Sequence, residues 1–207
     1  MKNITATQHN PFGFQPPCEP FVPGYGDANA DFHVIGDHPG VHGGSESGIP
    51  FTGTPAAERL QRALVDGGLL TEAGTPPTVD KTYLSYLFLC GDRVPDEEDY
   101  ADHEPMFDTE VRAITSHVLL PVGERATKHV FANMTAEPAD DVDMEALHAT
   151  EVRGSGWLVY PIKDPVEWTD EDESELVASL MALLATDYRQ EAELGRFLPG
   201  DDVWRVR

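Results

Sequence analysis

The sequence predicts an α/β fold of three layers, in which helices cover both faces of a central, mostly parallel four-stranded sheet. One observation is that short apolar runs rich in β-branched and aromatic residues alternate with longer segments whose apolar residues recur at helical spacing. A second is that glycine loops follow two of the predicted strands, as in turns that lead from a parallel strand into a helix. The 207 residues, 40% of them hydrophobic, supply enough apolar material for a packed core.

The amino-terminal part is predicted to differ from the rest. Residues 1–25 are rich in Pro, Gly and aromatic residues without periodicity, which indicates an irregular arm. Residues 26–207 are expected to form a single domain. Its first strand is predicted at 30–35 and its first helix at 55–65, with Thr54 as the N-cap.

The later elements continue the alternation. Strands are predicted at 83–90, 117–123 and 157–161. Helices are predicted at 96–116, 124–131 and 171–188, and an acidic linker at 135–150. Leucines at helical spacing are expected to face the core from the last helix: Leu176, Leu180, Leu183 and Leu184.

The net charge of −23, from 37 acidic and 14 basic side chains, is the opposite of what a phosphate-binding surface needs. In molar salt, however, the screening length falls to about 3 Å, so a surface dense in carboxylates repels other negative charges little and stays hydrated. The composition is similar to that of halophilic proteins. Under this hypothesis the charge reflects the solvent rather than the ligand.

The apolar runs, the first residues and the two cysteines indicate the compartment of the protein and its crosslinks. Membrane spans need about 18 to 20 consecutive apolar residues, which this chain lacks, and its first residues lack the pattern of a secretory signal. We therefore expect a cytoplasmic protein without a membrane partner. Cys18 and Cys90 are far apart and form no CxxC pair, so neither a disulfide framework nor a zinc ribbon is indicated, although a single disulfide remains open.

The loop at 36–40, Gly-Asp-His-Pro-Gly, follows the first predicted strand and is the first candidate for a functional site. Gly36 and Gly40 are predicted to adopt backbone angles closed to other residues, and Pro39 to stiffen the turn. Asp37 then lies beyond the carboxyl end of the strand, where open α/β sheets bind ligands. A turn or N-cap role for Asp37 remains an equal alternative.

This loop and the segment 48–53, Gly-Ile-Pro-Phe-Thr-Gly, together resemble the uracil-DNA glycosylase superfamily. The resemblance is closest to its iron–sulfur, family-4-like branch, whose first motif reads Gly-Glu-Ala-Pro-Gly followed by Gly-x-Pro-Phe-x-Gly. It continues in the same order at 83–90, 119–126 and 153–161, and so covers nearly all of the chain from residue 24 onward. Four short motifs in order are more specific than any one of them.

The resemblance implies an enzyme of base excision repair that flips a damaged, uracil-type base out of DNA and hydrolyses its N-glycosidic bond. Asp37 occupies the acidic position that orients or deprotonates the attacking water, and Asp164 occupies a second catalytic position. Phe51 falls where the family stacks an aromatic ring on the base, although a plain core Phe fits as well. The resemblance assigns the base pocket to Gly36, His38, Pro39, Gly40, Phe51 and Tyr86.

Two departures put this reaction in question. Tyr86 stands where the family has an Asn whose amide reads the edge of uracil. Asp164 stands where the family has a His that donates to the departing base, and a carboxylate repels that developing charge unless it is protonated. Either Lys163 replaces the donor or the reaction is lost, and a Lys beside an Asp is more often a surface pair.

The cofactor of the branch is also in question. Its iron–sulfur cluster has four cysteine ligands: Cys18 matches one of the amino-terminal pair, Cys90 matches the third, and His103 lies near the place of the fourth, while one amino-terminal ligand is missing. We therefore expect no cluster, no other metal, and instead two buried thiols with a solvated histidine. A further group, His33, His38 and His42, gives only a weak metal pattern.

Two functions stay open. The first is an active monomeric glycosylase acting on DNA that contains a damaged base. The second is a catalytically inactive member of the superfamily that binds nucleic acid or a nucleotide; a separate nucleotide- or phosphate-binding α/β domain is a weaker third option. Convergence of Asp37, Phe51, Tyr86 and Asp164 on one base-sized cleft would favour the enzyme, and a Tyr86 ring filling that cleft would favour the binding protein.

Overall fold

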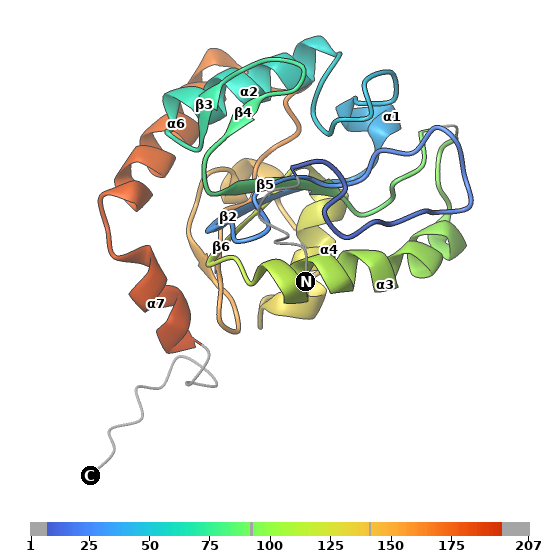
Figure 1. Cartoon of the computed structure of the whole chain (residues 1–207). Helices are drawn as coiled ribbons and strands as arrows, with labels where there is room; N and C mark the ends of the chain where they lie inside the picture. Colours follow the sequence, from blue (N-terminus) through green and yellow to red (C-terminus); the bar gives the residue numbers. More distant parts are fainter. Residues whose placement is uncertain (1–7, 92, 141, 196–207) are drawn as a thin grey trace.

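A six-stranded sheet with the order β1-β5-β2-β6-β8-β7 forms the middle layer of the computed structural model, which describes residues 8–91, 93–140 and 142–195 (Figure 1). The four central strands pair in parallel, and the edge strands β1 and β7 pair antiparallel. The predicted parallel four-stranded sheet is thus confirmed, with one antiparallel strand added at each edge. The strands are β1 Tyr25–Gly26, β2 Phe32–Gly36, β5 Thr82–Tyr86, β6 Val118–Pro121, β7 Val152–Arg153 and β8 Leu158–Val159.

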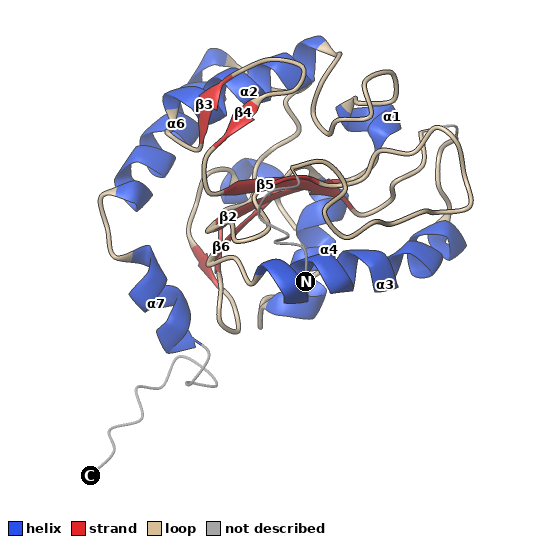
Figure 2. Cartoon of the chain, viewed as in Figure 1, coloured by secondary structure: helices blue, strands red, loops and turns tan. Residues whose placement is uncertain are grey.

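Helices cover both faces of this sheet, as predicted (Figure 2). On one face lie α2 and α6 with a small hairpin of β3 and β4, and on the other lie α3 and α4. The helices are α1 Pro39–His42, α2 Pro55–Asp66, α3 Glu97–Ile114, α4 Glu124–Met134, α5 Met144–Leu147, α6 Asp170–Leu184 and α7 Tyr188–Gly195. The hairpin strands are β3 Leu70–Glu72 and β4 Thr78–Val79. Among the described residues, none of the helices is both long and apolar enough to cross a membrane.

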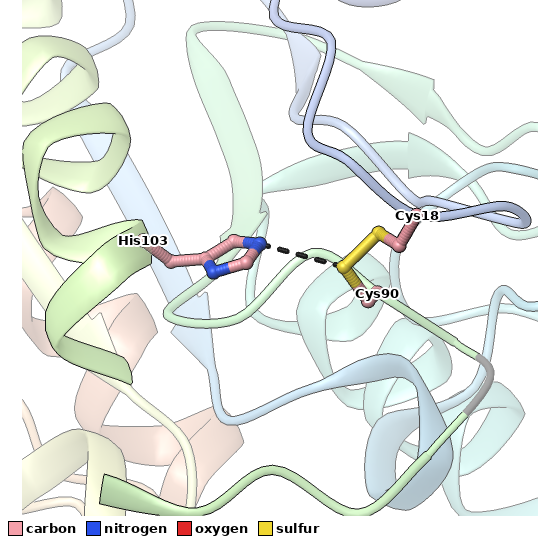
Figure 3. Close-up of side chains that lie close together, drawn as sticks. All are labelled: Cys18, Cys90 and His103. Atoms are coloured by element: carbon pink, nitrogen blue, oxygen red, sulfur yellow. Dashed lines mark hydrogen bonds between the residues drawn. A yellow bond between two sulfur atoms is a disulfide. The ribbon is translucent and has the colours of Figure 1, made fainter. Parts of the chain in front are cut away.

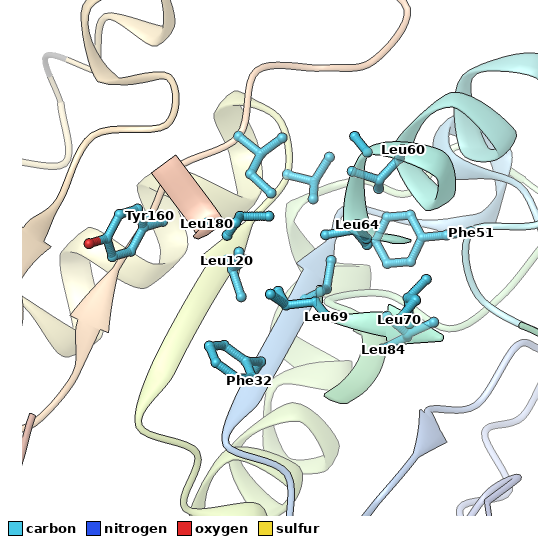
Figure 4. Packing of buried hydrophobic residues seen from close by; sticks show 14 of the residues in the cluster. Phe32, Phe51, Leu60, Leu64, Leu69, Leu70, Leu84, Leu120, Tyr160 and Leu180 are labelled. Atoms are coloured by element: carbon cyan, nitrogen blue, oxygen red, sulfur yellow. The ribbon is translucent and has the colours of Figure 1, made fainter. Parts of the chain in front are cut away.

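Side-chain alternation along the central strands divides the core into two layers. From β2, Phe32 and Val34 pack into the cluster under α2 and α6, in which Figure 4 labels Phe32. Ile35 points to the other face and packs into the cluster over α3 and α4. From α6, Leu176, Leu180 and Leu183 are buried as predicted, but Leu184 is 38% exposed. It is the last residue of the helix and lies at the edge of the apolar stripe.

Two boundaries differ from the sequence prediction because burial is not the same as strand pairing. Residues 87–90 are buried like the strand before them, yet β5 ends at Tyr86. Beyond that point the chain bonds to the arm, where Val22 N donates to Leu89 O at 2.8 Å. The acidic segment predicted as a linker contains the one-turn helix α5.

The described part of the arm lies against one edge of the domain. Isolated bridges join His9 to Tyr25 and Phe21 to Cys90, and Gly91 N donates to Pro20 O at 3.0 Å. Residues 1–7, which include the start used for the prediction about secretion, lie outside the described residues.

Candidate active site

The carboxyl ends of β2, β5, β6 and β8 meet at one edge of the sheet, and the loops that leave them carry the candidate residues. The loop after β2 is bonded to the segment after β5, since Leu87 N donates to Gly36 O at 3.0 Å and Phe88 N to Asp37 O at 3.1 Å. The loops after β6 and β8 are bonded in turn, with Gly123 N donating to Ile162 O at 2.8 Å. Parallel strands thereby bring residues 37 and 164 to the same edge.

Glycine is required at positions 36 and 40 for space rather than for backbone angle, which corrects the sequence interpretation. Neither residue has a positive φ. A Cβ on Gly36 would lie 2.7 Å from the Tyr86 ring, and one on Gly40 would lie 2.8 Å from the His38 ring. The left-handed backbone occurs instead at Gly43, with φ of 86°, just after α1.

His38 and Pro39 start the one-turn helix α1. The His38 ring is buried, and its Nδ1 accepts a hydrogen bond from Gly40 N at 3.1 Å, so it acts as the N-cap. Burial lowers the pKa of His38, with the opposing charge of Asp37 raising it in part. The structure therefore gives His38 a positioning role in the loop.

Helix α1 folds the His42 ring back beneath the first loop. Its Nδ1 accepts a hydrogen bond from Asp37 N at 3.0 Å, so in the neutral ring the proton is on Nε2. That Nε2 lies 3.6 Å from Asp164 Oδ2, and the ring is only 3% exposed. Gly123, which has a φ of 83°, lies next to this ring, since a Cβ there would be in ordinary contact with it at 3.7 Å. His42 thus connects the loop of Asp37 to the loop of Asp164.

Asp164 is held in its ionised form. Burial alone would raise its pKa, but the contact with His42 and a hydrogen bond from Val166 N at 3.0 Å outweigh burial, so the pKa lies below its ordinary value. A carboxylate that stays ionised is not a proton donor to a departing base. Next to it, the neutral imidazole of His42 presents an Nε2–H that can donate.

Lys163 does not take over that role. Its side chain is buried rather than solvated, and Nζ donates to Glu145 Oε2 at 2.8 Å and to Asp172 Oδ1 at 3.2 Å. The hydrogen bond with Glu145 contributes most to raising the pKa of Lys163. The ammonium is thus committed to α5 and α6, away from Asp164.

Asp37 is half-buried and is oriented by a residue from α3. The hydroxyl of Tyr100 donates to Asp37 Oδ1, and the guanidinium of Arg125 lies 4.3 Å from the centre of the Tyr100 ring. A cavity of about 630 Å³ opens beside this group between α3 and α4, and Tyr100, Arg125 and Lys128 are among its lining residues. A second cavity, of about 330 Å³, is lined in part by Asp164. Asp164 therefore borders open space directly, whereas Asp37 is next to the first cavity only through its partner Tyr100.

Phe51 and Tyr86 lie under the same loops but are closed to solvent, at 1% and 0% exposure. The Tyr86 ring centre is 5.1 Å from that of Phe51 and 6.2 Å from that of His42. Its hydroxyl accepts from Phe51 N at 2.7 Å and reaches the carbonyl oxygen of Gly43 at 2.9 Å. The Tyr86 ring thus fills the space behind Asp37, and a base can contact Phe51 only if the loop between α1 and α2 moves.

Two residues that build this site, His42 and Tyr100, were not predicted from the sequence as catalytic or base-binding residues. His42 appears there only in a weak metal pattern, although its place one helical turn after His38 is a signal for a ring that folds back on Asp37. Tyr100 is separated from Asp37 by 63 residues, so its contact depends on how α3 packs and leaves no local signal.

The position of the implied iron–sulfur cluster holds a different donor set. Such a cluster takes four thiolates, whereas Cys18 and Cys90 are the two cysteines of this sequence and form a disulfide (Figure 3). His103 is 4% exposed, with its ring centre 4.3 Å from that of Phe88. The residues therefore do not fit the cluster, and the expectation of free thiols beside a solvated histidine is wrong, because the sulfurs are bonded and the ring is packed in the core.

Comparison with known proteins identifies relatives over most of the chain. A sequence model described as the uracil DNA glycosylase superfamily matches residues 23–181. A type-5 uracil-DNA glycosylase of Pyrobaculum aerophilum is 28% identical over 142 residues, which cover 64% of this chain and 62% of that protein. A type-4 uracil-DNA glycosylase of Saccharolobus solfataricus is 25% identical over 147 residues, which cover 69% and 60%. The matches thus span about 60% of the length of these curated relatives.

Proposed function

Because the chain belongs to the uracil DNA glycosylase superfamily, we propose that it is a divergent DNA glycosylase that excises a damaged, uracil-type base in base excision repair. The observation that carries the proposal is the connection of Asp37, His42 and Asp164 at the carboxyl edge of the sheet. It supplies an acid for the sugar side of the bond and a donor for the base side. Asp37 and Asp164 are the proposed catalytic positions, and His42 is added to them.

In this proposal Asp37 acts on the attacking water. Its Oδ1 is bonded to Tyr100, so Oδ2 is assigned to the water. The water oxygen bonds to the sugar carbon as the bond between that carbon and the base nitrogen breaks, and the bonding electrons leave with the base. One proton of the water passes to Oδ2 of Asp37. Positive charge that grows on the sugar is stabilised by the nearby carboxylate.

His42 acts on the departing base. Its Nε2–H is directed toward the edge that Asp164 also faces, and an N–H donor there stabilises negative charge on a base oxygen. Asp164 acts through its charge beside Nε2 rather than by touching the base, because its ionised carboxylate would repel that oxygen. The remaining pocket positions, Gly36, His38, Pro39 and Gly40, shape the loop that presents Asp37.

The test is cleavage of labelled single-stranded and duplex oligonucleotides that carry one uracil, in about 2 M KCl. We expect an alkali-labile abasic product with the wild-type chain and a loss of at least about 100-fold with Asp37→Asn. Asp187→Asn is the matched control, since it makes the same chemical change at an exposed position before α7. Equal cleavage by Asp37→Asn and Asp187→Asn would refute the role of Asp37.

A second candidate is supported by the burial of Tyr86. A full ring in place of an amide, with its hydroxyl bonded to the loop backbone, favours a member of the superfamily that binds nucleic acid without excising a base. In that case uracil-containing and undamaged strands should bind with equal affinity in a fluorescence anisotropy titration, and the cleavage assay should give no product. Tighter binding to uracil together with product supports the enzyme.

A further inference from the structure

The side chains of Cys18, Cys90 and His103 form a separate cluster, and neither proposed function uses them. Their ligand atoms, two sulfurs and one ring nitrogen, all lie within 4.8 Å of one another. They come from three separate parts of the chain: the arm, the segment after β5, and α3 (Figure 3). Such a set of soft donors is the kind that binds zinc and similar cations.

We propose that, once the disulfide is reduced, these three residues bind a single thiophilic divalent cation of the zinc type. The distance from His103 Nε2 to Cys90 Sγ is 3.4 Å. Zinc bonds of about 2.3 Å to sulfur and 2.0 to 2.1 Å to nitrogen, at a tetrahedral angle, place those two atoms about 3.6 Å apart. The histidine is therefore already at ligand distance from one sulfur, and only the second sulfur has to move.

The tautomer of His103 supports the same assignment. Its Nδ1 lies 2.9 Å from the carbonyl oxygen of Asp99, which only accepts, so Nδ1 carries the proton of the neutral ring. The lone pair of Nε2 then points at the sulfurs. A metal-bound histidine commonly donates its other N–H to a backbone carbonyl in this way. In the oxidised chain this lone pair faces a disulfide sulfur, which has no proton to donate to it. The ring is only 4% exposed, so water has little access to the lone pair.

Backbone contacts keep the ligands together when the sulfur bond is absent. Val22 N donates to Leu89 O at 2.8 Å, and Gly91 N donates to Pro20 O at 3.0 Å. These bonds join the arm just after Cys18 to the residues on both sides of Cys90. Reduction therefore releases the two thiols without separating the segments that carry them.

The reaction balances with a dithiol as the reductant. The dithiol gives two electrons and two protons to the bond between Cys18 and Cys90, so two thiols form and the dithiol becomes a disulfide. The cation then displaces both thiol protons to the solvent and is bound by two thiolates and His103, with a fourth position left for water. The disulfide and the cation are thus alternative crosslinks between the arm and the domain.

The experiment uses the full chain and cobalt(II) as the probe, because 37 acidic side chains can bind cations weakly through oxygen. Thiolate ligands give a charge-transfer absorption that carboxylates do not give. After reduction with a phosphine, we expect this band with one cobalt per chain, its removal by one equivalent of zinc, and its absence in the oxidised chain. The Cys18→Ser/Cys90→Ser variant should lack it under all conditions.

Matched histidine variants test the third ligand. His103→Gln should weaken cobalt binding at least tenfold, whereas His9→Gln, at an exposed position on the arm, should leave it unchanged. A reduced chain with two titratable thiols but without the band would overturn the proposal, and so would His103→Gln binding as tightly as wild type. If reduction alone unfolds the chain, cobalt should restore the far-UV circular dichroism together with the band, and a failure to restore it would also overturn the proposal.

Discussion

Removing the hydroxyl of Tyr86 should destabilise the chain far more than removing the hydroxyl of Tyr160, whose partner is exposed. In Tyr86→Phe the ring and its packing stay, but Phe51 N loses its acceptor at 2.7 Å, and Gly43 O and His42 O lose a donor at 2.9 and 3.0 Å. The hydroxyl is fully buried, so water does not replace it.

The cost follows from these contacts. A buried N–H without a partner costs about 1 to 3 kcal/mol, and a shared hydrogen bond to the carbonyls adds about 1 kcal/mol. We therefore expect a loss of about 2 to 4 kcal/mol in the free energy of unfolding. For a chain of this length a loss of about 3 kcal/mol lowers the melting temperature by roughly 6 to 12 °C.

The assay is urea unfolding of both proteins at one KCl concentration, with Tyr160→Phe as the matched control. The Tyr160 hydroxyl donates to Glu151 Oε2 at 3.0 Å, and Glu151 is exposed, so water can replace the bond. The control should lose less than about 1 kcal/mol. Equal losses in the two variants would refute the argument that the Tyr86 hydroxyl fastens the loop between α1 and α2.

Two further predictions concern charge. Burial raises the pKa of Glu110 to about 8 from an ordinary 4.5, so between these pH values the folded state keeps a proton that the unfolded state has lost. Relative to Glu110→Gln, the free energy of unfolding of the wild type should therefore fall by about 1.4 kcal/mol per pH unit from pH 5 to about 8 and then level off. Urea unfolding of both proteins across this range would measure the difference, and a difference that does not vary with pH would contradict the prediction. The net charge of −23 predicts that the melting temperature, followed by circular dichroism, rises with KCl up to the molar range, and a constant value would exclude adaptation to salt.

The parts of the fold that the sequence predicted are those with a repeating signal. The apolar runs gave β2, β5, β6 and β8, and the helical spacing with its Thr54 cap gave α2, where Thr54 Oγ1 accepts from Ala57 N at 3.1 Å. The edge strands β1 and β7 have two residues each, which is too short for a period to be visible. Their pairing depends on neighbours that are distant in sequence, so it had to come from the structure.

In the candidate site, too, the local features were predictable from the sequence and the contacts between distant residues were not. The loop with Asp37 was located correctly at the end of a buried strand, because the change from apolar residues to a Gly and Pro turn is local. The predicted reason for glycine at position 36 was wrong. The actual reason is the close approach of the Tyr86 ring, which belongs to another strand. Contacts across the sheet edge, such as that of Tyr100 with Asp37, have no counterpart in local sequence.

Under the proposed function, the carboxylate of Asp164 at the position that the resemblance gives to a histidine need not abolish the chemistry, because His42 lies between Asp164 and Asp37. The distance of 3.6 Å from His42 Nε2 to Asp164 Oδ2 is too long for a hydrogen bond, so the Nε2–H is not committed to the carboxylate. A base oxygen that reached this nitrogen would gain the bond that Asp164 does not make. His42 is only 3% exposed, however, so the loop between α1 and α2 must first move, and the Tyr86 hydroxyl is what fastens that loop. Loop opening is therefore the step on which the choice between a glycosylase and a binding protein depends.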